Sequence, residues 1–93
     1  MNALTDEMVI EITKDIARAN NVSFARVVTA PAIDSSGSEA IEVRIVLTPG
    51  SFNAIIGERS ALTISQLIQK LADAGERRFP IVRYEEQVAP HRS

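Results

Sequence analysis

Apolar and polar residues repeat with two different periods along this chain, and the periods predict five structural elements. Apolar residues recur at helical spacing over residues 5–20 and 61–74. Within residues 39–48 every second side chain from Ile41 to Leu47 is apolar, residues 23–30 are rich in β-branched residues, and residues 79–85 predict a third strand. The pattern therefore predicts two helices and three strands in the order α-β-β-α-β.

The middle strand shows the clearest alternation. Four apolar residues point to one side of it: Ile41, Val43, Ile45 and Leu47. Glu42, Arg44 and Val46 point to the other side. Glu42 and Arg44 therefore share a face, at a spacing that suits a surface ion pair.

The helix ends carry recognisable signals. Thr5 is expected to cap the first helix, which Asn20 and Asn21 are expected to end. Ser60 or Thr63 is expected to cap the second helix, with Thr63 and Gln66 at capping-box spacing, and Gly75 follows the helix as a C′ residue would. The first helix should present this apolar face: Met8, Val9, Ile12, Ile16 and Ala19. The second should present another: Ile64, Leu67, Ile68 and Leu71.

The order of the elements predicts the topology. The first two strands, joined by the short polar loop at residues 34–38, should form an antiparallel hairpin. The second helix should connect the second strand to a parallel third strand by a right-handed crossover. One apolar stripe on each helix places both helices on the same face of the sheet. We expect an α+β two-layer sandwich over residues 1–86, followed by a flexible tail at 87–93.

Composition narrows the classes of function. The 93 residues carry a net charge of −2 and contain no cysteine, which removes disulfides and thiolate ligands. The sequence has neither a signal-peptide pattern nor an apolar run of about 20 residues, so a cytoplasmic, soluble protein without a membrane partner is expected. The single histidine, His91, lies near the end of the sequence, and Glu85 and Glu86 point to opposite faces of a strand. We expect no enzyme, no metal and no cofactor.

The stretch "AIIGERSALTISQLI" resembles the signature of KH RNA-binding domains, and the element order is similar to the type II form over residues 39–84. The resemblance implies a loop that grips a nucleic-acid backbone, with Gly57 and Arg59 as contacts. Ser60 stands where the family has a second glycine, and Glu58 adds a negative charge. A side chain obstructs the phosphate and a carboxylate repels it. We therefore predict a structural turn at Gly57–Ser60 that binds RNA weakly or not at all.

Arginines gather in the last third of the sequence. Arg77, Arg78 and Arg83 lie close together with Tyr84 beside Arg83, and Arg59 and Lys70 precede them. This cluster could form a patch for an anion or an acidic partner, or an ordinary solvated surface.

A surplus of apolar residues on the strands suggests an interface. Two helices cover only one sheet face, and we expect Val46, Val82 and Tyr84 on the other face. The leading hypothesis is a small non-catalytic domain that binds a protein partner or a second copy of itself. The alternative hypothesis is a degenerate KH-like nucleic-acid-binding domain.

Overall fold

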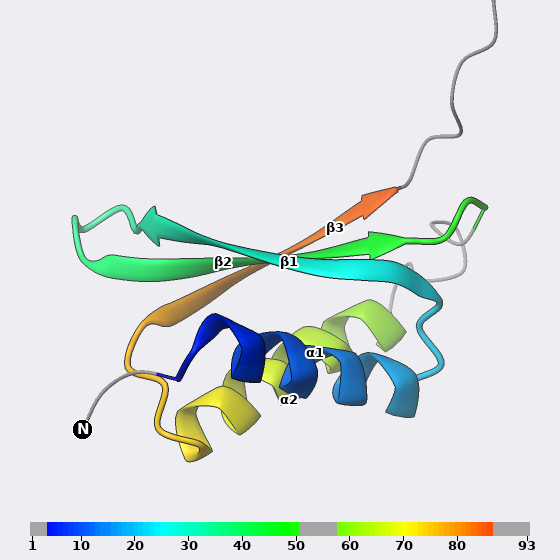
Figure 1. Ribbon diagram of the computed structural model, residues 1–93, viewed down its shortest axis with the longest axis horizontal. Coiled ribbons are helices and arrows are strands. Elements are labelled where there is room, and N and C mark those ends of the chain that lie inside the picture. The colour runs from blue at the N-terminus through cyan, green and yellow to red at the C-terminus, as the bar shows by residue number, and fades with distance from the viewer. Residues whose placement is uncertain (1–3, 51–57, 87–93) are drawn as a thin grey trace, which may run out of the picture.

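The computed structural model describes residues 4–50 and 58–86, which form a three-stranded sheet with two helices on one of its faces (Figure 1). The predicted α+β two-layer sandwich is confirmed. The elements follow the predicted order: α1 (Asp6–Ala19), β1 (Phe24–Ile33), β2 (Glu39–Leu47), α2 (Glu58–Asp73) and β3 (Phe79–Glu86). Gly57, the tail at residues 87–93 and His91 lie outside the described residues.

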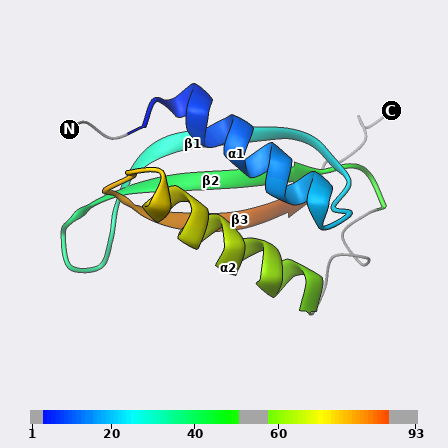
Figure 2. The same ribbon diagram turned by 90° about the horizontal axis from the view of Figure 1, so that it is seen from below.

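The sheet has the strand order β1-β2-β3. β1 and β2 form the predicted antiparallel hairpin, and β3 runs parallel to β2, as the α2 connection requires. Seen from the helix side, α1 and α2 both lie across the sheet, with α2 along the side of β3 (Figure 2). β2 is therefore the central strand.

The hairpin turn is organised by one carboxylate. Asp34 Oδ1 accepts hydrogen bonds from the backbone N–H groups of Ser36 and Ser38, both at 2.9 Å, and from the Ser36 hydroxyl at 2.7 Å. The Ser36 hydroxyl contributes most to the lowered pKa of Asp34. Gly37 completes the turn at a φ of 88°, a conformation that glycine adopts without steric cost.

The α1 helix begins and ends where its capping residues predict. Thr5 Oγ1 accepts a hydrogen bond from the Met8 backbone N–H at 3.2 Å, and Asn20 caps the end of the helix after Ala19, followed by Asn21 at a φ of 60°. The predicted apolar face is partly wrong, because Met8 is 50% exposed. The fully buried line is Val9, Thr13 and Ala17. Thr13 is tolerated there because its hydroxyl donates to the Val9 carbonyl at 2.8 Å.

The α2 helix begins three residues before the predicted position, at Glu58 rather than at residue 61. Ser60 and Thr63 therefore both lie inside the helix, and the predicted capping role is wrong for each of them. The Thr63 hydroxyl donates to the carbonyl oxygen of Arg59 at 2.9 Å. Leu67 and Leu71 are fully buried, as the apolar stripe predicts, and Thr63 continues their line toward the start of the helix.

The core lies between the helices and the sheet. The four apolar residues predicted to share one face of β2 are each at most 1% exposed: Ile41, Val43, Ile45 and Leu47. β1 extends three residues beyond its predicted end at residue 30, through Pro31 to Ile33. A proline is compatible with a strand at the edge of a sheet, since its missing N–H can face outward.

One ion pair fastens the connection between α2 and β3 to the start of the domain. Glu76 Oε2 accepts from Arg78 Nε at 2.8 Å, and Oε1 accepts from Arg78 Nη2 at 3.0 Å. Arg78 Nη2 also lies 3.4 Å from the carbonyl oxygen of Leu4, which it contacts as a donor. The hydrogen bond from Arg78 lowers the pKa of Glu76 against the opposing effect of burial. The pair sets the entry of the chain into β3.

Candidate binding surface

The helices leave one face of the sheet uncovered among the described residues (Figure 1). We call this surface the open face. Strand alternation and register assign it twelve residues. They are Arg26, Val28, Ala30 and Ala32 on β1, Ala40, Glu42, Arg44 and Val46 on β2, and Phe79, Ile81, Arg83 and Glu85 on β3.

Ion pairs cross the centre of the open face. Arg83 Nε lies 2.8 Å from Glu42 Oε2, and Arg44 Nε lies 3.5 Å from Glu42 Oε1. Arg44 Nη1 lies 3.6 Å from Glu85 Oε1. The predicted ion pair between Glu42 and Arg44 is therefore present, as part of a larger network across β2 and β3. Ion pairs that keep contact with solvent contribute little to stability, and these side chains are 25–64% exposed, so we interpret the network as a patterned surface.

The Arg44 guanidinium is incompletely satisfied. Its Nε atom is buried and has no hydrogen-bond acceptor among the described residues. Glu42 is within ion-pair distance, but 3.5 Å is too long for a strong hydrogen bond.

The expectation that Val82 and Tyr84 lie on the open face is wrong. The register pairs Val82 with Val43 and Tyr84 with Ile45, so both side chains share the helix-covered face with the core. Both pack against the buried clusters, and the Tyr84 hydroxyl donates to the Ser60 carbonyl oxygen in α2 at 3.1 Å. Burial raises the pKa of Tyr84. The physical reason is the charge on the opposite side of β3. If Val82 and Tyr84 faced solvent, Arg83 and Glu85 would point toward the helices and their charges would be buried.

Val46 does lie on the open face, as expected, but it is only 2% exposed. It therefore offers little free apolar area to a partner. The uncovered apolar side chains of this face are instead Phe79, which is 55% exposed, and the half-buried Val28 and Ile81. The sequence pattern contained this signal, since Phe79 and Ile81 alternate with the residues that fill the core.

Hydrogen bonds from α1 and β3 hold the N-terminal half of α2, whose first turn carries Arg59 and Ser60. Asn20 Nδ2 donates to Thr63 Oγ1 at 3.0 Å and to Gln66 Oε1 at 2.9 Å, which joins the end of α1 to α2. Tyr84 fastens the same turn to β3 through Ser60. The exposed Arg59 side chain borders an open hollow between the two helices, lined by Ala19, Asn20, Asn21, Arg59 and Leu62.

The structure does not bring the predicted arginine cluster into one patch. Arg78 is 18% exposed and paired with Glu76 at the helix side of the sheet, whereas Arg83 lies on the open face and is paired with Glu42. Arg77 is exposed in the connection between α2 and β3. Neighbouring carboxylates pair with the guanidinium groups of Arg78 and Arg83.

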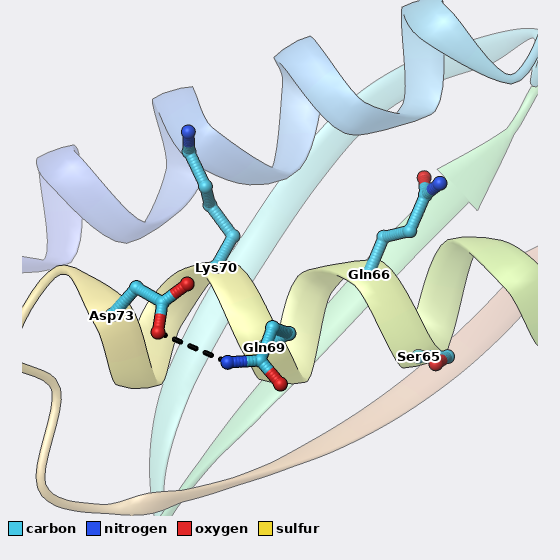
Figure 3. A pocket seen from close by; sticks show the side chains of 5 residues that line it. All are labelled: Ser65, Gln66, Gln69, Lys70 and Asp73. Carbon is cyan, nitrogen blue, oxygen red and sulfur yellow. Dashed lines mark hydrogen bonds between the residues drawn. The ribbon is translucent and has the colours of Figure 1, made fainter.

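The outer side of α2 carries another open hollow (Figure 3). Gln69 Nε2 donates to Asp73 Oδ1 at 2.9 Å, while Lys70 and Gln66 point toward α1 (Figure 3). Ser65 stands apart from the other four side chains drawn in Figure 3.

Other classes of site lack support in the described part of the chain. Residues 4–50 and 58–86 contain no group of three or more His, Cys, Asp or Glu side chains that could hold a metal ion. Within the same ranges, no helix is long and apolar enough to cross a membrane. The open face therefore remains the most extensive candidate.

Sequence reasoning identified two members of the ionic network but missed its connection to β3. Glu42 and Arg44 were recognisable from their spacing, whereas the contact from Arg83 depends on the pairing of β2 with β3. Comparisons with protein-family models, curated proteins and solved structures found no match for this chain. The geometry of the surface alone must carry the functional argument.

Proposed function

We propose that this protein is a non-catalytic binding domain that holds a protein partner on its open face. The observation that carries the proposal is a sheet face on which an ionic network lies beside uncovered apolar side chains. The network comprises Glu42, Arg44, Arg83 and Glu85, and Phe79 and Ile81 adjoin it on β3. Protein interfaces combine apolar contacts with direct polar contacts, and this face offers groups for both.

The charges of the open face define the chemistry of the partner. Three guanidinium groups and two carboxylates lie on it, from Arg26, Arg44, Arg83, Glu42 and Glu85. A strongly acidic ligand would meet the two carboxylates, and a strongly basic one would meet the three arginines. The surface best suits a protein surface with charges of both signs, arranged to complement the network.

The edges of the sheet are less suitable for a partner than its face. Pro31 removes a backbone donor from β1, and the register between β1 and β2 shifts between Phe24 and Arg26. β3 begins with Phe79-Pro80 and ends with Glu85-Glu86. Prolines, charges and irregular register on edge strands disfavour the addition of another strand.

A second candidate function is nucleic-acid binding at the start of α2, as the KH resemblance implies. It is favoured by the exposed Arg59 on a turn that Tyr84 and Asn20 hold in place. It is disfavoured by the net charge of −2 and by the dispersed arginines. We propose it as the weaker alternative, with RNA bound weakly or not at all.

Site-specific photocrosslinking tests the main proposal. Benzoylphenylalanine is placed at Phe79 or Ile81 on the open face, and at Asp15 on the outer side of α1 as the control. In an extract of the cells that express the protein, the two sheet positions should give a shared protein adduct that Asp15 does not give. Mass spectrometry identifies the joined peptides. No adduct from either sheet position, or the same adducts from all three, would contradict the proposal.

A further inference from the structure

We propose that the partner of the open face is a second copy of this chain, packed face to face about a two-fold axis that crosses β2 at Val43. This inference rests on the proposed function, because it names the partner of the same surface. An axis across the strands runs the two β2 strands in opposite directions. Residue 42 of one copy then lies over residue 44 of the other, since the two positions are equally distant from Val43.

The charges on β2 select this axis. Arg44 of each copy faces the partner's Glu42, so two ion pairs form across the interface. A two-fold axis along β2 would instead place Arg44 over the partner's Arg44, and buried like charges are costly. The Arg44 and Glu42 side chains are 37% and 25% exposed, so both reach the surface on which the second copy would pack.

The neighbouring strands are compatible with the same register. β1 and β3 pair with β2 so that Val28 and Arg83 flank Arg44, while Ala30 and Ile81 flank Glu42. Val28 therefore meets the partner's Ala30, a large side chain over a small one. The aliphatic part of the Arg83 side chain packs on the partner's Ile81, while its guanidinium group keeps its contact with Glu42 in the same chain.

The corners of the face do not need to match. Two packed sheets cross at about 30° because each sheet is twisted, so their corners diverge. Arg26, Phe79 and Glu85 lie in the outer rows of the open face. The contacts that these outer residues make with the second copy therefore contribute less to the interface than the contacts in the two central rows.

The size of the face predicts a weak dimer. Three strands spaced about 4.8 Å apart, with about eight residues each, cover roughly 370 Å² per copy. Two such areas lie below the roughly 1,200 Å² that separates weak contacts from interfaces of standard size. We therefore expect a dissociation constant in the micromolar range or weaker. Self-association should then become measurable at chain concentrations between about 10 µM and about 1 mM.

Sedimentation equilibrium of the purified chain over this range tests the proposal. R44E and E42R should each weaken self-association at least tenfold, because each places like charges across the axis. An equimolar mixture of the two variants should associate again, since it opposes carboxylates to guanidinium groups. The doubly exchanged E42R/R44E chain should also dimerise, and it keeps a pair of opposite charges within the chain. K14E on α1 changes the charge as much as R44E does and should leave the dimer intact.

Circular dichroism of each variant establishes that it is folded before its association is interpreted. A wild-type chain that stays monomeric at about 1 mM would overturn the inference. So would a dimer that R44E leaves unchanged, or a mixture of folded R44E and E42R that fails to associate. If the purified chain is monomeric while the crosslinks from Phe79 or Ile81 identify another protein, the second copy is rejected and the proposed function stands.

Discussion

Replacement of Glu76 by glutamine should destabilise the domain through the loss of one buried ion pair. The Glu76 side chain has no exposed surface and accepts three donors of Arg78, whose side chain is 18% exposed: Nε at 2.8 Å, Nη2 at 3.0 Å and the backbone N–H at 2.9 Å. Glutamine keeps the shape but removes the charge, and its amide group confronts one of these donors.

The magnitude follows from the geometry. Breaking a buried ion pair costs about 3–5 kcal/mol, because the remaining charge loses its partner. Arg78 keeps partial contact with solvent, and a glutamine oxygen in the place of Oε2 keeps two of the three hydrogen bonds. We therefore expect Glu76→Gln to lower the free energy of unfolding by about 2 kcal/mol. In a domain of this size, that corresponds to a fall in Tm of roughly 8–16 °C.

The dependence on pH separates the ion pair from simple packing. The folded pKa of Glu76 is lowered from its ordinary value of 4.5 by the hydrogen bond from Arg78. Its stabilising contribution is therefore complete above that value and is lost as the pH falls through the lowered folded pKa. The difference in stability between wild type and Glu76→Gln should be largest at neutral pH and should shrink below about pH 4.5.

Urea denaturation at several pH values, followed by circular dichroism, measures this difference. Glu11→Gln is the matched control, because Glu11 Oε2 lies 3.9 Å from Lys14 Nζ and its side chain is 62% exposed. The control should change stability by less than about 0.5 kcal/mol. Equal effects of the two substitutions, or a loss for Glu76→Gln that does not vary with pH, would refute the reasoning.

Three further outcomes are expected. Leu67→Ala should lower the free energy of unfolding by about 2–5 kcal/mol in urea denaturation, since Leu67 is fully buried; a loss below about 1 kcal/mol would contradict its place in the core. Tyr84 is the single tyrosine, so ultraviolet absorbance of tyrosinate reads its titration directly, and the midpoint should lie above 10.0 in the folded chain and return toward that value in denaturant. An unshifted folded midpoint would contradict its burial under α2. Titration of single-stranded RNA at low salt should give no saturable shifts in the amide resonances of residues 57–60; saturable shifts there, abolished by Gly57→Asp in a folded chain, would favour the KH-like alternative.

The sequence alone determined which residues belong together on each element. The alternation in β2 separated Ile41 and Val43 from Glu42 and Arg44, because consecutive side chains of a strand point to opposite faces whatever surrounds them. Local hydrogen bonding also made the ends of α1 predictable, since Thr5 and Asn20 act within one helical turn.

Only the tertiary structure decided which face of each element is covered. The alternation of side chains along β3 places Val82 and Tyr84 on the same face of the strand, but it does not tell whether the helices cover that face. The pairing of β3 with β2 shows that they do. The same pairing brought Arg83 to Glu42. The chain folds this way because packing Val82 and Tyr84 beneath α2 removes apolar surface from water, while Arg83 and Glu85 keep their charges solvated. That balance is a property of the assembled layers, so local spacing could not decide it.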